Sequence, residues 1–93
     1  MNGNMVKFNI NLFTKKVTDI TKETSVVAKY SNTIQEVLEA SCHFWGIKVE
    51  DYILTNSKYV LLPLDFTAGK LFIDSNGSQM IELFLHNKYT LCF

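Results

Sequence analysis

Residues 31–46 decide the fold, and they read SNTIQEVLEASCHFWG. Thr33 and Glu36 have the T-x-x-E spacing of a capping box, in which each side chain accepts a hydrogen bond from the other residue's backbone N–H. The side chains that follow recur at helical intervals, which is typical of a helix with one buried face. They are Ile34, Val37, Leu38, Ser41 and Trp45. Gly46 is suited to the left-handed conformation that ends a helix, so the pattern predicts a helix over residues 33–45.

The residues upstream of this helix predict two strands. Residues 6–13 read VKFNINLF, and every second side chain is apolar, which is typical of a half-buried strand. A second strand is expected at residues 25–30, which read SVVAKY. The polar residues 14–24 between them form either a long hairpin connection or the weakly paired start of the second strand.

Shorter elements are expected downstream of the helix. Residues 52–55 and 58–62 read as two short strands joined by a tight turn, and Pro63 ends the second because it has no N–H to donate. Residues 64–73 are expected to form a loop or a single helical turn, followed by a short extended run. Residues 80–85 alternate and are nearly all apolar, which predicts a last strand in the centre of the sheet.

The composition describes one small folded domain. The 93 residues are 47% hydrophobic and 19% charged, which is too apolar for a disordered segment and too short for a second domain. Nine lysines balance nine acidic residues and no arginine is present, so a general nucleic-acid-binding surface is not expected.

Cysteine usage and hydropathy indicate the cellular compartment of the domain. Two cysteines allow one disulfide at most, which favours a reducing compartment. The N-terminal residues MNGNMVKF have no apolar core of a signal peptide, and no stretch is long enough to span a membrane. We expect a cytoplasmic protein without membrane insertion, and the apolar end Leu91-Cys92-Phe93 predicts that the domain is a fragment of a larger protein.

Residues able to carry out chemistry are few and poorly placed. Cys42 and His43 are neighbours on the predicted helix, where their side chains point about 100° apart, so Cys42 is interpreted as a core residue. The residues Cys42, His43, His86 and Cys92 also lack the spacing of a zinc site. Glu36 and Glu39 are expected on the outward side of the helix. We therefore expect neither enzymatic activity nor a cofactor or metal.

The aromatic residues have mainly structural interpretations. Trp45, at the end of the helix, is interpreted as an anchor that packs the helix onto the sheet, with an exposed binding role as the alternative. Phe8, Phe72 and Phe84 are expected in the core.

The order of elements and several short motifs resemble ubiquitin-like domains. The motifs are Met5-Val6-Lys7-Phe8, Ser31-Asn32-Thr33-Ile34 with Val37, and Ser75-Asn76-Gly77-Ser78 before MIELFL. The resemblance covers roughly residues 5–87. It implies an α+β fold of the β-grasp type, with one main helix packed across a mixed sheet of four or five strands. Its first and last strands would be adjacent and parallel at the centre.

A narrower resemblance is to the Ras-binding type of ubiquitin-like domain found in ELMO engulfment proteins and some formins. It is carried by Phe44-Trp45-Gly46-Ile47 and Asp51-Tyr52-Ile53-Leu54. This resemblance implies a non-catalytic module whose second strand and basic hairpin bind a GTP-loaded small GTPase of the Ras superfamily. The matching partner-binding residues are Lys15, Lys16, Ser25, Val27 and Lys29.

The charge distribution suits an acidic protein partner for this hairpin. Residues 1–30 hold five lysines against two acidic residues, a net charge of +3, whereas residues 31–56 hold one lysine against four, a net charge of −3. The absence of arginine weakens the GTPase interpretation, because many Ras-binding domains use one. The alternative is a ubiquitin-like scaffold or self-association domain that binds no GTPase. A conjugated modifier is disfavoured, because activation needs a terminal Gly-Gly and this sequence ends in Cys92-Phe93.

Overall fold

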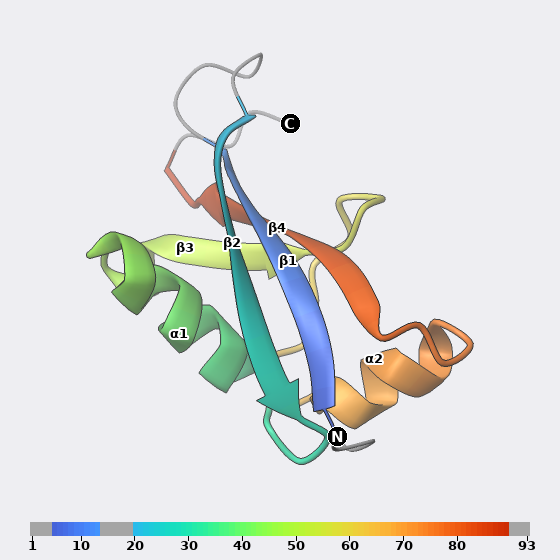
Figure 1. The fold of residues 1–93 in the computed structure, drawn as a ribbon. Coiled ribbons are helices and arrows are strands. Elements are labelled where there is room, and N and C mark those ends of the chain that lie inside the picture. Colours follow the sequence, from blue (N-terminus) through green and yellow to red (C-terminus); the bar gives the residue numbers. More distant parts are fainter. Residues whose placement is uncertain (1–4, 14–19, 90–93) are drawn as a thin grey trace.

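A computed structural model describes residues 5–13 and 20–89, with side chains for residues 5–12 and 22–89. In this part of the chain, four strands form one sheet, and two helices and one 3₁₀ turn pack with it (Figure 1). In chain order the elements are β1 (Met5–Phe13), β2 (Ile20–Lys29), α1 (Ile34–Trp45), the 3₁₀ turn η1 (Val49–Asp51), β3 (Tyr52–Thr55), α2 (Ala68–Asp74) and β4 (Met80–Asn87). No helix in these residues is both long enough and apolar enough to cross a membrane.

The sheet has the strand order β2-β1-β4-β3. β1 and β4 lie parallel at its centre, and the two outer pairs, β1 with β2 and β3 with β4, are antiparallel. This arrangement, with α1 across one face, is the predicted β-grasp fold. β2 begins earlier than the expected residue 25, because the polar residues 22–24 continue the pairing with β1.

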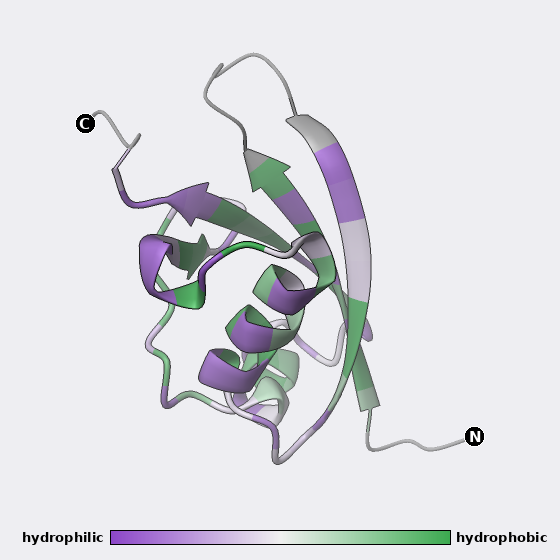
Figure 2. Ribbon diagram, turned by 90° about the vertical axis from the view of Figure 1, so that its left-hand side faces the viewer, coloured by the Kyte–Doolittle hydropathy of each residue, from purple (hydrophilic) through white to green (hydrophobic). Residues whose placement is uncertain are grey.

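The capping signals fix both ends of α1. Thr33 Oγ1 accepts from Glu36 N–H at 3.3 Å, and Glu36 Oε1 accepts from Thr33 N–H at 2.8 Å, which is the predicted capping box. At the other end, Gly46 has a φ of 66°, the left-handed conformation that glycine adopts without strain. Hydrophilic and hydrophobic residues alternate along the turns of α1 (Figure 2), as expected for a helix with one buried face.

One hydrophobic core lies between α1 and the sheet. The inward side chains of β1, β4 and β3 meet those of α1 there, and their largest fully buried members are Phe8, Ile10, Ile34, Leu54, Leu83 and Leu85. Trp45 is half-buried against this core, in agreement with the anchoring interpretation. Phe72 is also half-buried against it and stacks on Tyr30 with ring centroids 5.0 Å apart.

The predicted strand over residues 58–62 is wrong. The segment forms only an isolated bridge between Leu61 and Thr55. The Asn56 side chain explains this, because its Oδ1 accepts from Lys58 N–H at 2.9 Å and from Val60 N–H at 3.0 Å. Tyr59 between them has a φ of 61°, so the backbone turns here instead of extending.

The prediction for residues 64–73 is also wrong in its second half, because α2 occupies Ala68–Asp74. Thr67 caps this helix by accepting from Lys70 N–H at 3.1 Å. Gly69 lies against Tyr30, and a Cβ at this position would come within 3.1 Å of the Tyr30 Cβ. Gly69 therefore permits a close contact between α2 and Tyr30, the residue that follows β2.

Candidate functional site

β2 forms one edge of the sheet, since its only partner strand in the described part of the chain is β1. Both backbone groups of Lys29 point away from β1: its N–H donates to Asn32 Oδ1 at 2.7 Å, and its C=O accepts from Asn32 N–H at 2.9 Å. Backbone direction alternates along a strand, so Glu23, Ser25 and Val27 also direct N–H and C=O to the outer edge. No described residue is hydrogen bonded to these edge-facing groups.

Three of the five predicted site residues lie together on this strand. The face of β2 that points away from α1 carries every second side chain, namely Ser25, Val27 and Lys29. All three side chains are exposed. Val27 is 57% exposed, which is high for an aliphatic side chain in a sheet. Lys15 and Lys16 lie outside the described residues. The structure therefore places an apolar side chain and a lysine beside a strand edge that no other described strand pairs with.

Lys7 belongs to the same surface, and sequence reasoning did not include it among the site residues. It pairs with Val27 across β1 and β2 and is exposed on the same face. Its N–H donates to Gln79 C=O at 2.9 Å, away from β2, in agreement with the backbone alternation above. The alternating pattern of residues 6–13 already pointed Lys7 outward, but only the strand register brings it beside Val27.

A polar ladder follows along the outer face of the sheet. Asn9 Nδ2 donates to Glu23 Oε1 at 3.0 Å and to Glu82 Oε2 at 2.8 Å. Asn11 Nδ2 donates to Glu82 Oε1 at 2.8 Å and to Leu83 C=O at 3.1 Å. Because the Glu23 and Glu82 carboxylates lie here, the described part of the outer face is basic at the end that carries Lys7 and Lys29.

An aromatic cluster covers the β3 side of the same face. The Tyr59 ring meets Phe84 and His86 edge to face, with centroids 5.6 and 5.7 Å apart. Phe84 is therefore half-buried on the outer face and is not in the core, because its register with Asn11 points it away from α1. His86 Nε2 lies 2.9 Å from Thr55 Oγ1, and burial lowers the pKa of this imidazole.

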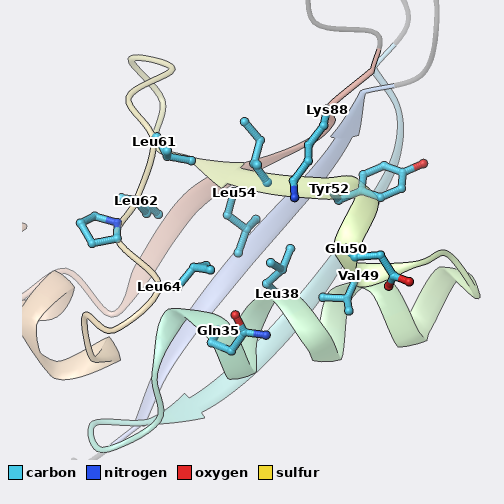
Figure 3. Close-up of a pocket in the computed structure, with 12 residues that line it drawn as sticks. Gln35, Leu38, Val49, Glu50, Tyr52, Leu54, Leu61, Leu62, Leu64 and Lys88 are labelled. Carbon is cyan, nitrogen blue, oxygen red and sulfur yellow. The ribbon is translucent and has the colours of Figure 1, made fainter.

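The opposite edge of the sheet, at β3, is covered by the chain itself. Leu62 N–H donates to Leu54 C=O at 3.1 Å, and Asn56 N–H donates to Val60 C=O at 3.0 Å. Beside this edge, α1, β3 and residues 61–64 line a groove of about 380 Å³, with Leu61, Leu62 and Leu64 at one end and Glu50 and Lys88 at the other (Figure 3). Of the two edges in the described sheet, β2 is the one left open.

Cys42, Glu36 and Glu39 lie where the sequence predicted them, whereas Cys92 lies outside the described residues. Cys42 is buried in the core, and desolvation raises the pKa of its thiol to about 11, which disfavours the nucleophilic thiolate. Glu36 and Glu39 are exposed on α1. The hydrogen bond that the Glu36 carboxylate accepts from Thr33 N–H is the main cause of its lowered pKa. Within the described ranges, no group of three His, Cys, Asp or Glu side chains is placed to hold a metal ion.

Comparisons with known proteins inform the fold. No protein-family model and no curated protein sequence matches the chain. Among solved structures, it is similar to the ubiquitin of Caldiarchaeum subterraneum, with a TM-score of 0.71 and 14% identity over 89% of this chain and 92% of that one. It is also similar to an Arabidopsis thaliana protein, with a TM-score of 0.67 and 9% identity over 91% and 88% of the two chains. The chain therefore has a ubiquitin-like β-grasp fold.

Proposed function

We propose that this domain is a non-catalytic protein-interaction module that binds a GTP-loaded small GTPase of the Ras superfamily through β2. The observation that carries the proposal is the open edge of β2, where Glu23, Ser25 and Val27 direct outward backbone groups that no described residue pairs with. Such an edge binds an extended segment of another protein by adding a strand to the sheet.

The side chains beside this edge favour an acidic partner. On one face of the sheet, the exposed Val27 has Lys7 directly opposite it on β1 and Lys29 two residues further along β2. Opposite charges across an interface steer the encounter, and an apolar side chain beside them contributes buried area. Lys15 and Lys16, which lie outside the described residues, are proposed as further contacts of an acidic switch region of the GTPase.

The first experiment is a titration of the labelled domain against Ras, Rho, Rap and Arf proteins, each loaded with GDP or with a GTP analogue. Binding should require the GTP analogue and should weaken with salt, because charges at an interface rim are screened over about 10 Å at 0.1 M ionic strength. The joint variant Lys16→Glu and Lys29→Glu should slow association severalfold. Lys58→Glu, in the exposed loop after β3, is the matched control.

A second pair of variants tests strand addition itself. The N–H of Ser25 faces the open edge, so Ser25→Pro removes no hydrogen bond to β1 and should leave the fold intact. It should weaken binding about tenfold or more, whereas Ser25→Ala, which keeps the N–H, should bind like the unmodified domain.

The outcomes separate the two candidate functions. Equal binding to both nucleotide states, or no binding to any GTPase, would remove the GTPase from the proposal. The alternative is then a scaffold or self-association domain, for which the same open edge would pair with a second copy or another protein. Sedimentation of the domain alone, with and without Ser25→Pro, would measure self-association.

A further inference from the structure

Asn32 occupies the outer edge of β2 beside Lys29, and hydrogen bonds hold it there from several sides. Its Oδ1 accepts from Lys29 N–H at 2.7 Å, and its N–H donates to Lys29 C=O at 2.9 Å. Its Nδ2 donates to Glu36 Oε1 at 3.2 Å, and its C=O accepts from Ala68 N–H at 2.7 Å. The Asn32 side chain thus takes the place at Lys29 that the carbonyl of a pairing strand would occupy.

We propose that Asn32 caps the open edge of β2 and confines strand pairing with a partner to Glu23, Ser25 and Val27. The identity of the partner in this inference rests on the proposed function, whereas the cap itself does not. A strand edge without a stop pairs in several registers, and a register shift of one residue turns every side chain to the other face. The cap at Lys29 therefore fixes where the partner strand ends while leaving the Lys29 side chain exposed.

The capped edge also specifies the chemistry of the strand that it accepts. A residue opposite Val27 would meet an exposed aliphatic side chain next to Lys7, so an apolar residue fits there and acidic residues fit beside it. A residue opposite Glu23 would meet a carboxylate, which favours a lysine or arginine. The partner segment is thus an extended strand of a predominantly acidic surface, with an apolar residue at the Val27 position.

Amide hydrogen exchange of the isolated domain, measured by NMR, tests the cap without any partner. The amides of Ser25 and Val27 should exchange fast, and those of Val26 and Ala28, which face β1, should be protected. The Lys29 amide should be protected in the unmodified domain and should exchange about tenfold faster in Asn32→Ala. Asn32→Asp keeps an oxygen acceptor and should restore the protection.

Exchange in the complex then tests the confined pairing. With the GTPase found by titration, binding should protect the Ser25 and Val27 amides of the unmodified domain. In Asn32→Ala, binding of the same GTPase should protect the Lys29 amide as well. Thr33 caps α1, so Asn32→Ala should fold, and Ser31→Ala serves as a control at an exposed neighbouring position.

Two results would overturn the inference: a Lys29 amide that exchanges at the same rate in Asn32→Ala and the unmodified domain, or a complex without added protection at Ser25 and Val27. If no GTPase binds, the proposed function fails, and the exchange of the isolated domain still decides whether Asn32 is a cap.

Discussion

Two isoleucines in the two helices give a sharp test of the packing. Ile34 begins α1 and is 0% exposed, whereas Ile73 lies near the end of α2 and is 73% exposed. Ile→Ala removes three carbon atoms at each position and improves helix propensity by a few tenths of a kcal/mol in both helices. Any difference between the two variants therefore reports burial rather than backbone preference.

The expected magnitude follows from that burial. Transferring three buried carbons to water costs about 2.4 kcal/mol, at about 0.8 kcal/mol each, and the cavity left between α1 and the sheet raises the total to about 3–4 kcal/mol for Ile34→Ala. Ile73→Ala should change the free energy of unfolding by less than about 0.5 kcal/mol. A domain of this size has about 5–14 kcal/mol of stability, so Ile34→Ala should still fold.

Urea unfolding followed by circular dichroism measures both variants, and equal slopes would confirm that the same surface is exposed on unfolding. In a thermal scan, Ile34→Ala should lower Tm by about 4–8 °C for each kcal/mol lost. A difference between the two variants of less than about 1 kcal/mol would refute the placement of Ile34 in the core, and with it the packing of α1 on the sheet.

Three further measurements test local features. Thr33→Ala removes the side-chain half of the capping box and should cost about 1 kcal/mol, and an unchanged Tm would argue against this helix start. His86 has a lowered pKa because burial disfavours its charge, so its contribution to stability is complete above its ordinary value of 6.5 and is lost as pH falls through the lower folded pKa. Denaturation midpoints between pH 7 and 5 should therefore fall less in His86→Gln than in the unmodified domain. Cys42 should resist alkylation at pH 8 until the domain unfolds. Mass spectrometry of a Cys92→Ser variant, in which Cys42 is the remaining thiol, can follow the labelling. Rapid labelling of the native protein would contradict the burial of Cys42 and its thiol pKa of about 11.

The local sequence determined the elements whose signals are complete within a few residues. Thr33, Glu36 and Gly46 carry the capping chemistry of α1, and the two-residue alternation of residues 6–13 separates the core face of β1 from its outer face. These signals involve neighbours in the chain, so they do not depend on where the rest of the protein lies. The resemblance to ubiquitin-like domains supplied the central parallel pair β1 and β4, which the structure confirms.

Tertiary structure decided the elements that depend on contacts or pairing with residues elsewhere in the chain. The close approach of Tyr30 leaves little room for a Cβ at position 69, which explains a glycine inside α2. Asn56 folds residues 56–60 into a loop where the apolar pattern suggested a strand. Phe84 looked like a core residue, but its register with β1 turns it to the outer face.

The candidate site also combines features that the sequence predicted with features that only the structure shows. The sequence predicted a strand over residues 25–30, in which the site residues chosen by the resemblance, Ser25, Val27 and Lys29, share one face because side-chain direction has a fixed period of two. It could not show that this strand lies at an open edge, that Lys7 stands beside Val27, or that Asn32 closes the edge at Lys29. Those facts depend on which strands pair and in which register, and register is set by burial of one whole face of the sheet rather than by any single segment.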